Sequence, residues 1–195
     1  ALAYAQTHPE RVTELVLRGI FLLRQWEIDW FYQAGASAIF PDAWEEYLAP
    51  IPEAERADLL RAYHRRLTGA DAAERRRCAL AWRRWEARTS FLLPDDAYLS
   101  PLEDPEVAAA FARIECHYFL HRGFFAGREP LDMVDRFRRI PAVIVQGRYD
   151  LVCPMETAWA LHRAWPEADF RIVPEARHAS HAAGVTHELV GAPGR

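Results

Sequence analysis

Two residues near the C-terminus, Asp150 and His178, have the types and the spacing that acid–base chemistry needs. Asp150 follows a short apolar run at 142–145, rich in β-branched residues, which predicts a buried strand of a parallel sheet. Functional groups in such sheets gather beyond the carboxyl ends of the strands, where Asp150 is expected to lie. A histidine can move a proton near neutral pH, and a carboxylate beside it can hold one tautomer and stabilise the imidazolium form.

Both residues also have ordinary structural explanations. Asp150 could be a turn residue that caps the next helix, and His178 could be a solvated loop histidine, with His181 as a competing candidate three residues later. The order of the elements favours the functional interpretation of the pair. Strand, Asp, helix, strand, His is the order in which α/β-hydrolases supply the last two members of a Ser–Asp–His triad.

Glu86 and Glu115 form a second candidate pair. The helices predicted over 71–90 and 104–122 each carry an apolar stripe, and one glutamate lies at the edge of each stripe. Two carboxylates beside aromatic surfaces could bind a cationic group, such as a free amine, in a partly apolar pocket. Alternatively, they are boundary residues, and Arg83 could pair with Glu86. The predicted stripes are Cys78, Trp82, Trp85 and Thr89 in the first helix and Val107, Phe111, Ile114 and Tyr118 in the second.

His117 and His121 lie one helical turn apart, a spacing at which two histidines can bind zinc. The sequence has no HExxH motif and no further ligand at a fixed spacing, so packing or solvent exposure is the favoured interpretation. Cys153 follows the candidate Asp150 and could serve only as a small buried hydrophobic residue.

Composition excludes several classes of protein. Of the 195 residues, 51% are hydrophobic and 12% aromatic, which predicts a folded chain rather than a disordered one. The net charge of −4 gives no electrostatic reason to expect binding to nucleic acid or to an anionic membrane. No apolar run approaches the roughly 18 residues of a membrane span. The three cysteines are widely spaced and odd in number, which fits a reducing cytoplasm better than a disulfide framework.

The predicted elements fall into an α/β pattern. Strands are expected at 13–18, 142–145 and 169–173, whereas residues 24–138 show helical patterns and no convincing strand. This arrangement predicts a parallel sheet of a partial α/β-hydrolase, formed by 1–23 and 139–195, with an inserted all-helical cap at 24–138 that could restrict access to the site. The chain begins with helical residues that no capping residue precedes, so we expect that an upstream part of the protein is missing.

Several segments together resemble the proline iminopeptidases (prolyl aminopeptidases), which are serine peptidases of the α/β-hydrolase fold. The segments are ALAYAQTHPERVTELVLRGIF, DWFYQAGAS with FPDAWEEYLAPIP, WEARTSFL, AFARIECHYF, GRYDLVCP and LHRAWPEA. The resemblance runs from Ala1 to about His178, some nine-tenths of the chain, and the combined motifs are highly specific.

This resemblance implies an enzyme that removes an N-terminal proline from peptides without a metal or an organic cofactor. Asp150 and His178 match the triad acid and base of the family, and Glu86 and Glu115 match the carboxylates that hold the amino group of the substrate. The nucleophilic serine would lie in a GGSWGST-like turn just upstream of Ala1. The walls of the proline pocket match Phe21 and Cys153, with Phe31 as a further aromatic candidate and Arg18 as a supporting polar residue.

The chain departs from the family pattern near its end. Arg177 and Ala179 flank His178 where the family has Gly-His-Ser, and the tail after Ser180 does not resemble the closing helix of the family. Because the upstream strands and an oxyanion donor would also be missing, we expect the chain to be inactive by itself. The alternatives are another capped α/β-hydrolase, acting on esters or amides without a free amine, and a non-catalytic truncated product.

Overall fold

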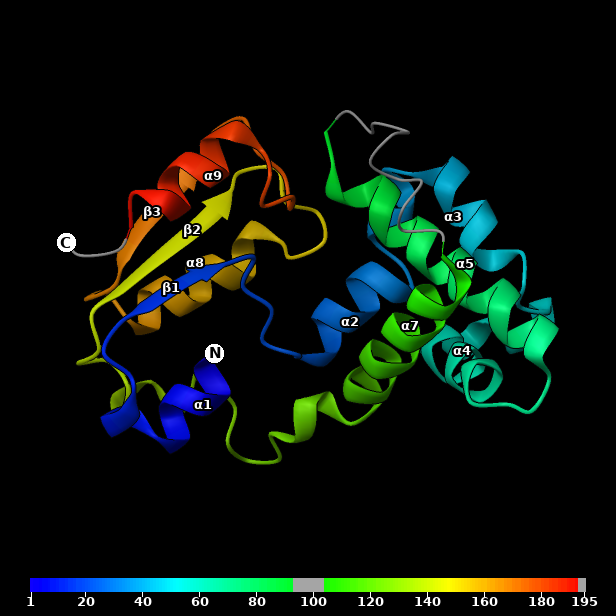
Figure 1. Cartoon of the computed structure of the whole chain (residues 1–195), viewed down its shortest axis with the longest axis horizontal. Coiled ribbons are helices and arrows are strands. Elements are labelled where there is room, and N and C mark those ends of the chain that lie inside the picture. Colours follow the sequence, from blue (N-terminus) through cyan, green and yellow to red (C-terminus); the bar gives the residue numbers. More distant parts are fainter. Residues whose placement is uncertain (93–103, 193–195) are drawn as a thin grey trace. The chain divides into compact units, whose positions relative to one another are not determined.

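The computed structural model describes residues 1–92 and 104–192 and divides into two compact units (Figure 1). The first, the sheet unit, combines Ala1–Leu22 with Phe125–Arg195. The second, the helical unit, is Leu23–Phe124. The two units are described separately below.

Three parallel strands form the sheet, in the order β1-β2-β3. They are β1 (Leu15–Arg18), β2 (Ala142–Gly147) and β3 (Asp169–Val173). Leu15 pairs with Ala142, and Val143 pairs with Asp169, so all three strands end at the same edge of the sheet. The predicted parallel sheet is therefore confirmed, and the long separation between β1 and β2 in sequence is the interval that holds the helical unit.

Helices cover both faces of the sheet. Neighbouring residues of β2 point to opposite faces, so Ile144 packs in one apolar cluster and Val145 in the other. Helix α8 (Met155–Ala164) and the short α1 (Leu2–Thr7) contribute to the Ile144 cluster, whereas α9 (Ala183–Val190) places Val185 in the Val145 cluster (Figure 1). The tail beyond Ser180, which departs from the family pattern in sequence, thus forms a helix that closes one face of the sheet.

The helical unit consists of helices whose ends follow simple capping rules. Asp71 and Asp104 accept hydrogen bonds from backbone N–H groups at the starts of α5 (Ala72–Ser90) and α7 (Pro105–Leu120). Pro41 and Pro105 occupy the first turns of their helices, where a missing N–H costs little. The described residues between 24 and 138 contain no strand. The α-helices of this unit are α2 (Gln25–Tyr32), α3 (Pro41–Leu48), α4 (Leu59–Leu67), α5 (Ala72–Ser90) and α7 (Pro105–Leu120).

The C-terminal boundary of the helical unit lies earlier than the predicted residue 138. Residues 125–138 pack with the sheet unit, and only Val134–Arg136 form a 3₁₀ turn where a helix was expected. Val134 and Phe137 are buried in the same cluster as Ile144, and the ring of Phe137 meets Trp165 edge-on at 5.0 Å between centroids. Burial of these two side chains holds the segment on the sheet unit. The role of the helical unit as a cap stays a prediction. The range predicted for the cap, 24–138, includes residues 93–103, which lie outside those that the structure describes.

The prediction of an apolar stripe on α7 was wrong. Val107, Ile114 and Tyr118 are exposed, and the buried positions are Ala108, Ala112 and Cys116. Small residues face inward because α7 packs along α5, whose buried Trp82 lies against Glu115 and Phe119 of α7. The stripe predicted for α5, in contrast, is buried throughout.

We expect Val145→Ala to lower the free energy of unfolding by roughly 1.5–3 kcal/mol, because it removes two methyl groups from a fully packed position. Val145 is 1% exposed, whereas Val190 in the same unit is 76% exposed. The matched control Val190→Ala should change stability by less than about 0.5 kcal/mol. Urea unfolding of both variants measures the difference, and equal effects would contradict the assigned core.

Candidate active site

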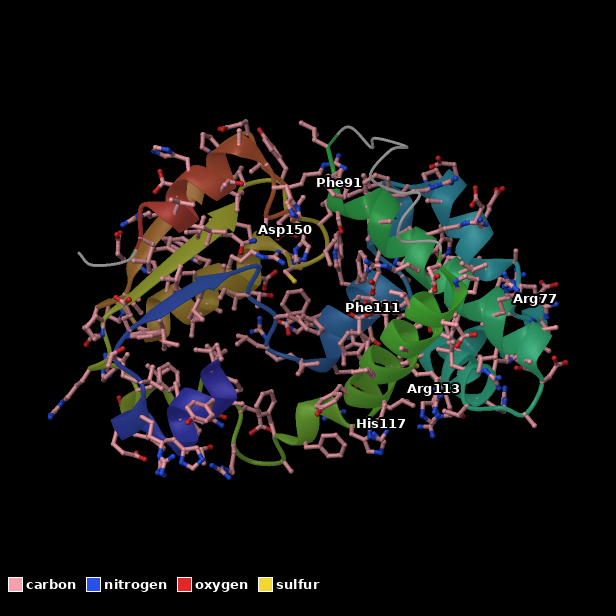
Figure 2. The ribbon with its side chains drawn as sticks, in the orientation of Figure 1. Arg77, Phe91, Phe111, Arg113, His117 and Asp150 are labelled. Atoms are coloured by element: carbon pink, nitrogen blue, oxygen red, sulfur yellow. The ribbon has the colours of Figure 1, made fainter. Side chains whose placement is uncertain are left out.

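Asp150 lies in the loop just beyond the end of β2 (Figure 2). Its side chain is buried, and its Oδ1 accepts the backbone N–H groups of Val152 at 3.0 Å and Cys153 at 2.8 Å. These hydrogen bonds stabilise the turn, which is the structural role that the sequence left open as an alternative for Asp150. They also fix the direction of the carboxylate and leave Oδ2 for another partner.

His178 supplies that partner from the loop after β3. Its Nδ1 lies 2.9 Å from Oδ2 of Asp150, so the contact predicted between these residues is present. A carboxylate accepts, so Nδ1 carries the proton, and the electron pair of the neutral ring is on Nε2, which can accept a hydrogen bond or a proton. Gln146 also donates to Oδ2, at the longer distance of 3.4 Å. An imidazole held in this way can act as a general base through Nε2.

Two glycines permit the close approach of these loops. A Cβ on Gly147 would lie 2.3 Å from the carbonyl oxygen of Arg177, which is shorter than any van der Waals contact. A Cβ on Gly19 would lie 2.9 Å from Cε1 of His178, and Gly19 has a positive φ of 52°. The loop that carries His178 can therefore lie directly against the ends of β1 and β2.

Arg18 contacts His178 from the end of β1. Its Nη1 donates to the backbone oxygen of His178 at 2.9 Å and lies 3.3 Å from Nε2. The resemblance implied only a supporting polar role for Arg18, and no pattern in the sequence predicted this contact across 160 residues. The guanidinium reinforces the position of the histidine loop.

The candidate pocket residues divide between the two units. Cys153 is buried beside Asp150, and its backbone oxygen accepts from Gln146 at 2.9 Å. Phe21 is half-buried in the sheet unit. Phe31 belongs to the helical unit, where its ring is 1% exposed and meets Tyr32 edge-on at 4.8 Å. Their roles in substrate binding stay predictions.

Glu86 and Glu115 come together in the interior of the helical unit. The indole N–H of Trp82 lies 3.1 Å from Oε1 of Glu86 and 3.1 Å from Oε2 of Glu115. The hydroxyl of Tyr32 donates to the same oxygen of Glu86 at 2.6 Å. The two carboxylates therefore share one fixed donor instead of lying apart on a helix boundary.

Burial and mutual repulsion shape the ionisation of this pair. Removal from water raises the pKa of Glu115 to about 10, and the neighbouring Glu86 adds to this effect. Burial also raises the pKa of Tyr32 well above its usual value, so its hydroxyl stays neutral and donates. Arg83 does approach Glu86, as the alternative interpretation required, but its Nη1 lies 3.6 Å from Oε2 and its guanidinium covers the ring of Phe111.

Sequence reasoning missed Tyr32 and Trp82 as partners of the glutamates. Trp82 precedes Glu86 by four residues, so the two lie on one face of α5, and this spacing was the available signal. Tyr32 is 54 residues from Glu86 and lies on another helix, so no local pattern could have indicated it.

His117 on α7 and His121 just beyond its end are the two histidines whose spacing could suit a metal ion. Nδ1 of His121 lies 2.8 Å from the backbone oxygen of His117, and Figure 2 shows His117 and Arg113 on this helix. Across residues 1–92 and 104–192, no group of three or more His, Cys, Asp or Glu side chains is arranged to hold a metal ion. In the same described part of the chain, no helix has the length and apolar character needed to cross a membrane.

Comparison with known protein families places the fold. Residues 1–184 match the α/β hydrolase fold family, and the chain belongs to that family. The strand order and the Asp150–His178 pair at the carboxyl edge of the sheet agree with this assignment.

Within the family, the chain is similar to proline iminopeptidases, as the sequence motifs predicted. It is 57% identical over its full length to a probable proline iminopeptidase of Leptolyngbya boryana and covers 61% of that protein. It is 56% identical over 92% of its length to a proline iminopeptidase of Xylella fastidiosa, covering 58% of it. It is 53% identical over 97% of its length to a proline iminopeptidase of Arabidopsis thaliana and covers 50% of that protein. The chain thus spans between half and about three-fifths of these relatives.

We expect Glu115→Gln to stabilise the chain at alkaline pH. The folded chain keeps a proton on this carboxyl up to about pH 10, whereas the unfolded chain releases it near pH 4.5. The stabilising effect of that proton is complete below about pH 4.5 and is lost as the pH rises toward 10. Glutamine avoids this loss, so the variant should gain roughly 1–3 kcal/mol near pH 8 and almost nothing near pH 4.

Urea unfolding at both pH values measures the gain in the Glu115→Gln variant. Glu45→Gln is the matched control, because Glu45 is an exposed glutamate of the same unit and should show no pH-dependent difference. Destabilisation of the Glu115→Gln variant near pH 8 would contradict the assignment of a buried, protonated carboxyl.

Proposed function

We propose that this chain is part of a proline iminopeptidase, a serine hydrolase that releases proline from the N-terminus of peptides. The observation that carries the proposal is the pair of Glu86, which is buried, and Glu115, which is half-buried, held on one indole N–H beside an aromatic cluster. An ester or amide without a free amine gives no role to two carboxylates, whereas an N-terminal proline presents a cationic secondary amine. The similarity to enzymes named proline iminopeptidase supports the same substrate class.

The proposed reaction assigns separate tasks to Asp150 and His178. His178 accepts the proton of a nucleophilic serine through Nε2, and Asp150 keeps the ring in the required tautomer and stabilises the imidazolium form. We propose that this serine lies just before the segment that matches Ala1, as the family resemblance implies. His178 then returns the proton to the leaving amine of the peptide. No step of this proposal uses a metal or an organic cofactor.

Substrate selection is assigned to the remaining candidates. Glu86 and Glu115 hold the amine and thereby restrict cleavage to a free N-terminus. In the sheet unit, Phe21 and Cys153 are assigned as apolar contacts for the proline ring, and Arg18 supports the loop of His178. In the helical unit, Phe31 is assigned as a further aromatic contact. The three cysteines are free and buried, which supports a proposed location in a reducing compartment such as the cytoplasm.

Ligand binding to the chain tests the proposed substrate class. L-Prolinamide carries the cationic amine, and N-acetyl-L-prolinamide has the same ring without the charge. Calorimetric titration should show binding of the first and at least tenfold weaker binding of the second. Equal affinities for the two compounds would overturn the proposal that the glutamates recognise an amine.

Glu86→Gln and Glu115→Gln should each lower kcat/KM for a proline anilide by about 10- to 100-fold. Each change keeps the shape of the side chain and removes one charged hydrogen bond, worth roughly 1.5–3 kcal/mol. The measurement uses a protein that carries this chain together with its serine. A neutral ester lacking the amine should be hydrolysed equally by variant and parent. Equal losses on both substrates would show that the glutamates are structural, and unchanged anilide cleavage would show that they do not contact the amine.

A further inference from the structure

Trp82 is the most enclosed aromatic residue beside the glutamate pair. Its side chain is fully buried in α5, stacked on Tyr32 with 4.5 Å between ring centroids and 14° between ring planes. Tyr63 meets it edge-on at 5.3 Å, and the ring of Phe119 lies 6.3 Å away. A ring packed on several sides cannot turn freely, so the direction of its N–H is fixed.

That fixed N–H lies between two acceptors. The indole nitrogen lies 3.1 Å from Oε1 of Glu86 and 3.1 Å from Oε2 of Glu115. The distance between these two oxygens is therefore at most twice 3.1 Å. One hydrogen cannot satisfy two ionised carboxylates in a low-dielectric interior. Tyr32 adds a second donor, but only to Glu86.

The ion pair between Arg83 and Glu86 is a loose one. Nη1 of Arg83 lies 3.6 Å from Oε2 of Glu86, and the guanidinium also lies over the ring of Phe111. A carboxyl group that kept its proton could donate to the other carboxylate and remove the repulsion. The raised pKa of Glu115 agrees with this arrangement.

We propose that Trp82 is a positioning residue whose indole N–H holds Glu86 and Glu115 around one shared proton, and that a cationic amine displaces this proton when it binds. The inference rests on the proposed function and extends it to the state of the site before the substrate arrives.

The exchange is balanced in charge and in hydrogen bonds. Before binding, the pair carries one negative charge and one carboxyl proton. A secondary ammonium brings one positive charge and two N–H donors, one for each carboxylate. The carboxyl proton passes to the buffer, and the pair then holds the ammonium with two negative charges. No oxidant, reductant or further reactant takes part.

Other groups around the pair do not change charge between about pH 5 and 9. Burial raises the pKa of Tyr32 on α2, Tyr47 on α3 and Tyr63 on α4 well above their usual values. It raises the pKa of Cys78 on α5 to about 11 and that of Cys116 on α7 further still. Arg83 on α5 stays cationic throughout. Proton release in this interval therefore reports on the shared proton.

Calorimetry in several buffers measures the released proton directly. L-Prolinamide is titrated into the chain at pH 7.5 in phosphate, HEPES and Tris, whose ionisation enthalpies differ, and the slope of observed heat against ionisation enthalpy gives the protons released. We expect close to one proton per amine for the parent chain. Glu115→Gln, which has no such proton, should bind at least tenfold more weakly and release almost none.

Trp82→Phe tests the positioning role. It keeps an aromatic ring but removes the N–H, so we expect about tenfold weaker binding and release of less than half a proton. Trp85→Phe is the matched control, because Trp85 is equally buried on the same helix but donates to the backbone oxygen of Phe31, at 3.1 Å. This control should release as much proton as the parent.

The outcomes separate this inference from the proposed function. Binding of L-prolinamide without proton release would overturn the shared proton and leave the proposed function standing. Absence of any preference for the cationic amine would overturn both. Parent-like proton release by a folded Trp82→Phe variant would overturn the role of Trp82. If Trp82→Phe does not fold, the comparison of the parent with Glu115→Gln still decides whether the proton is shared.

Discussion

An indole N–H shared by two carboxylates is the interaction around which the helical unit is packed. Glu86 is buried and Glu115 is half-buried beside the aromatic cluster, where Trp82 lies 3.1 Å from an oxygen of each and Tyr32 donates a further hydrogen bond to Glu86. Small side chains on α7, such as Ala112, let that helix pack close enough to α5 for Glu115 to reach the same donor. The close packing of α5 and α7 therefore also brings together the two carboxylates for which amine binding is proposed.

The sheet unit follows a similar principle with different residues. Asp150 is buried, and backbone N–H groups of its own loop fix its carboxylate before His178 contacts it. Gly147 provides the space for that contact, since a side chain there would collide with the loop of Arg177. In both units, fixed donors determine the direction of a carboxylate, and in the sheet unit His178 contacts the remaining oxygen of Asp150.

Local patterns in the sequence predicted what depends on local chemistry. The apolar, β-branched run at 142–145 located β2, and the helical patterns over 71–90 and 104–122 located α5 and α7. The order of elements also singled out Asp150 and His178, since parallel strands end at one edge. Prediction failed where distant packing decides. Phe137 packs with the sheet unit because it makes a buried contact with Trp165. The alanines of α7 face inward because Trp82 of α5 occupies the space beside that helix.

The protonation state of the glutamate pair tests this account most directly. Carbon-13 labelling of glutamate side chains reports the charge of each carboxyl through its chemical shift, and Gln substitutions assign the signals of Glu86 and Glu115. The account predicts that, in the chain without ligand at pH 7, the pair holds one proton that leaves only well above neutral pH. Two fully ionised carboxylates at pH 7, both titrating near pH 4.5, would contradict it.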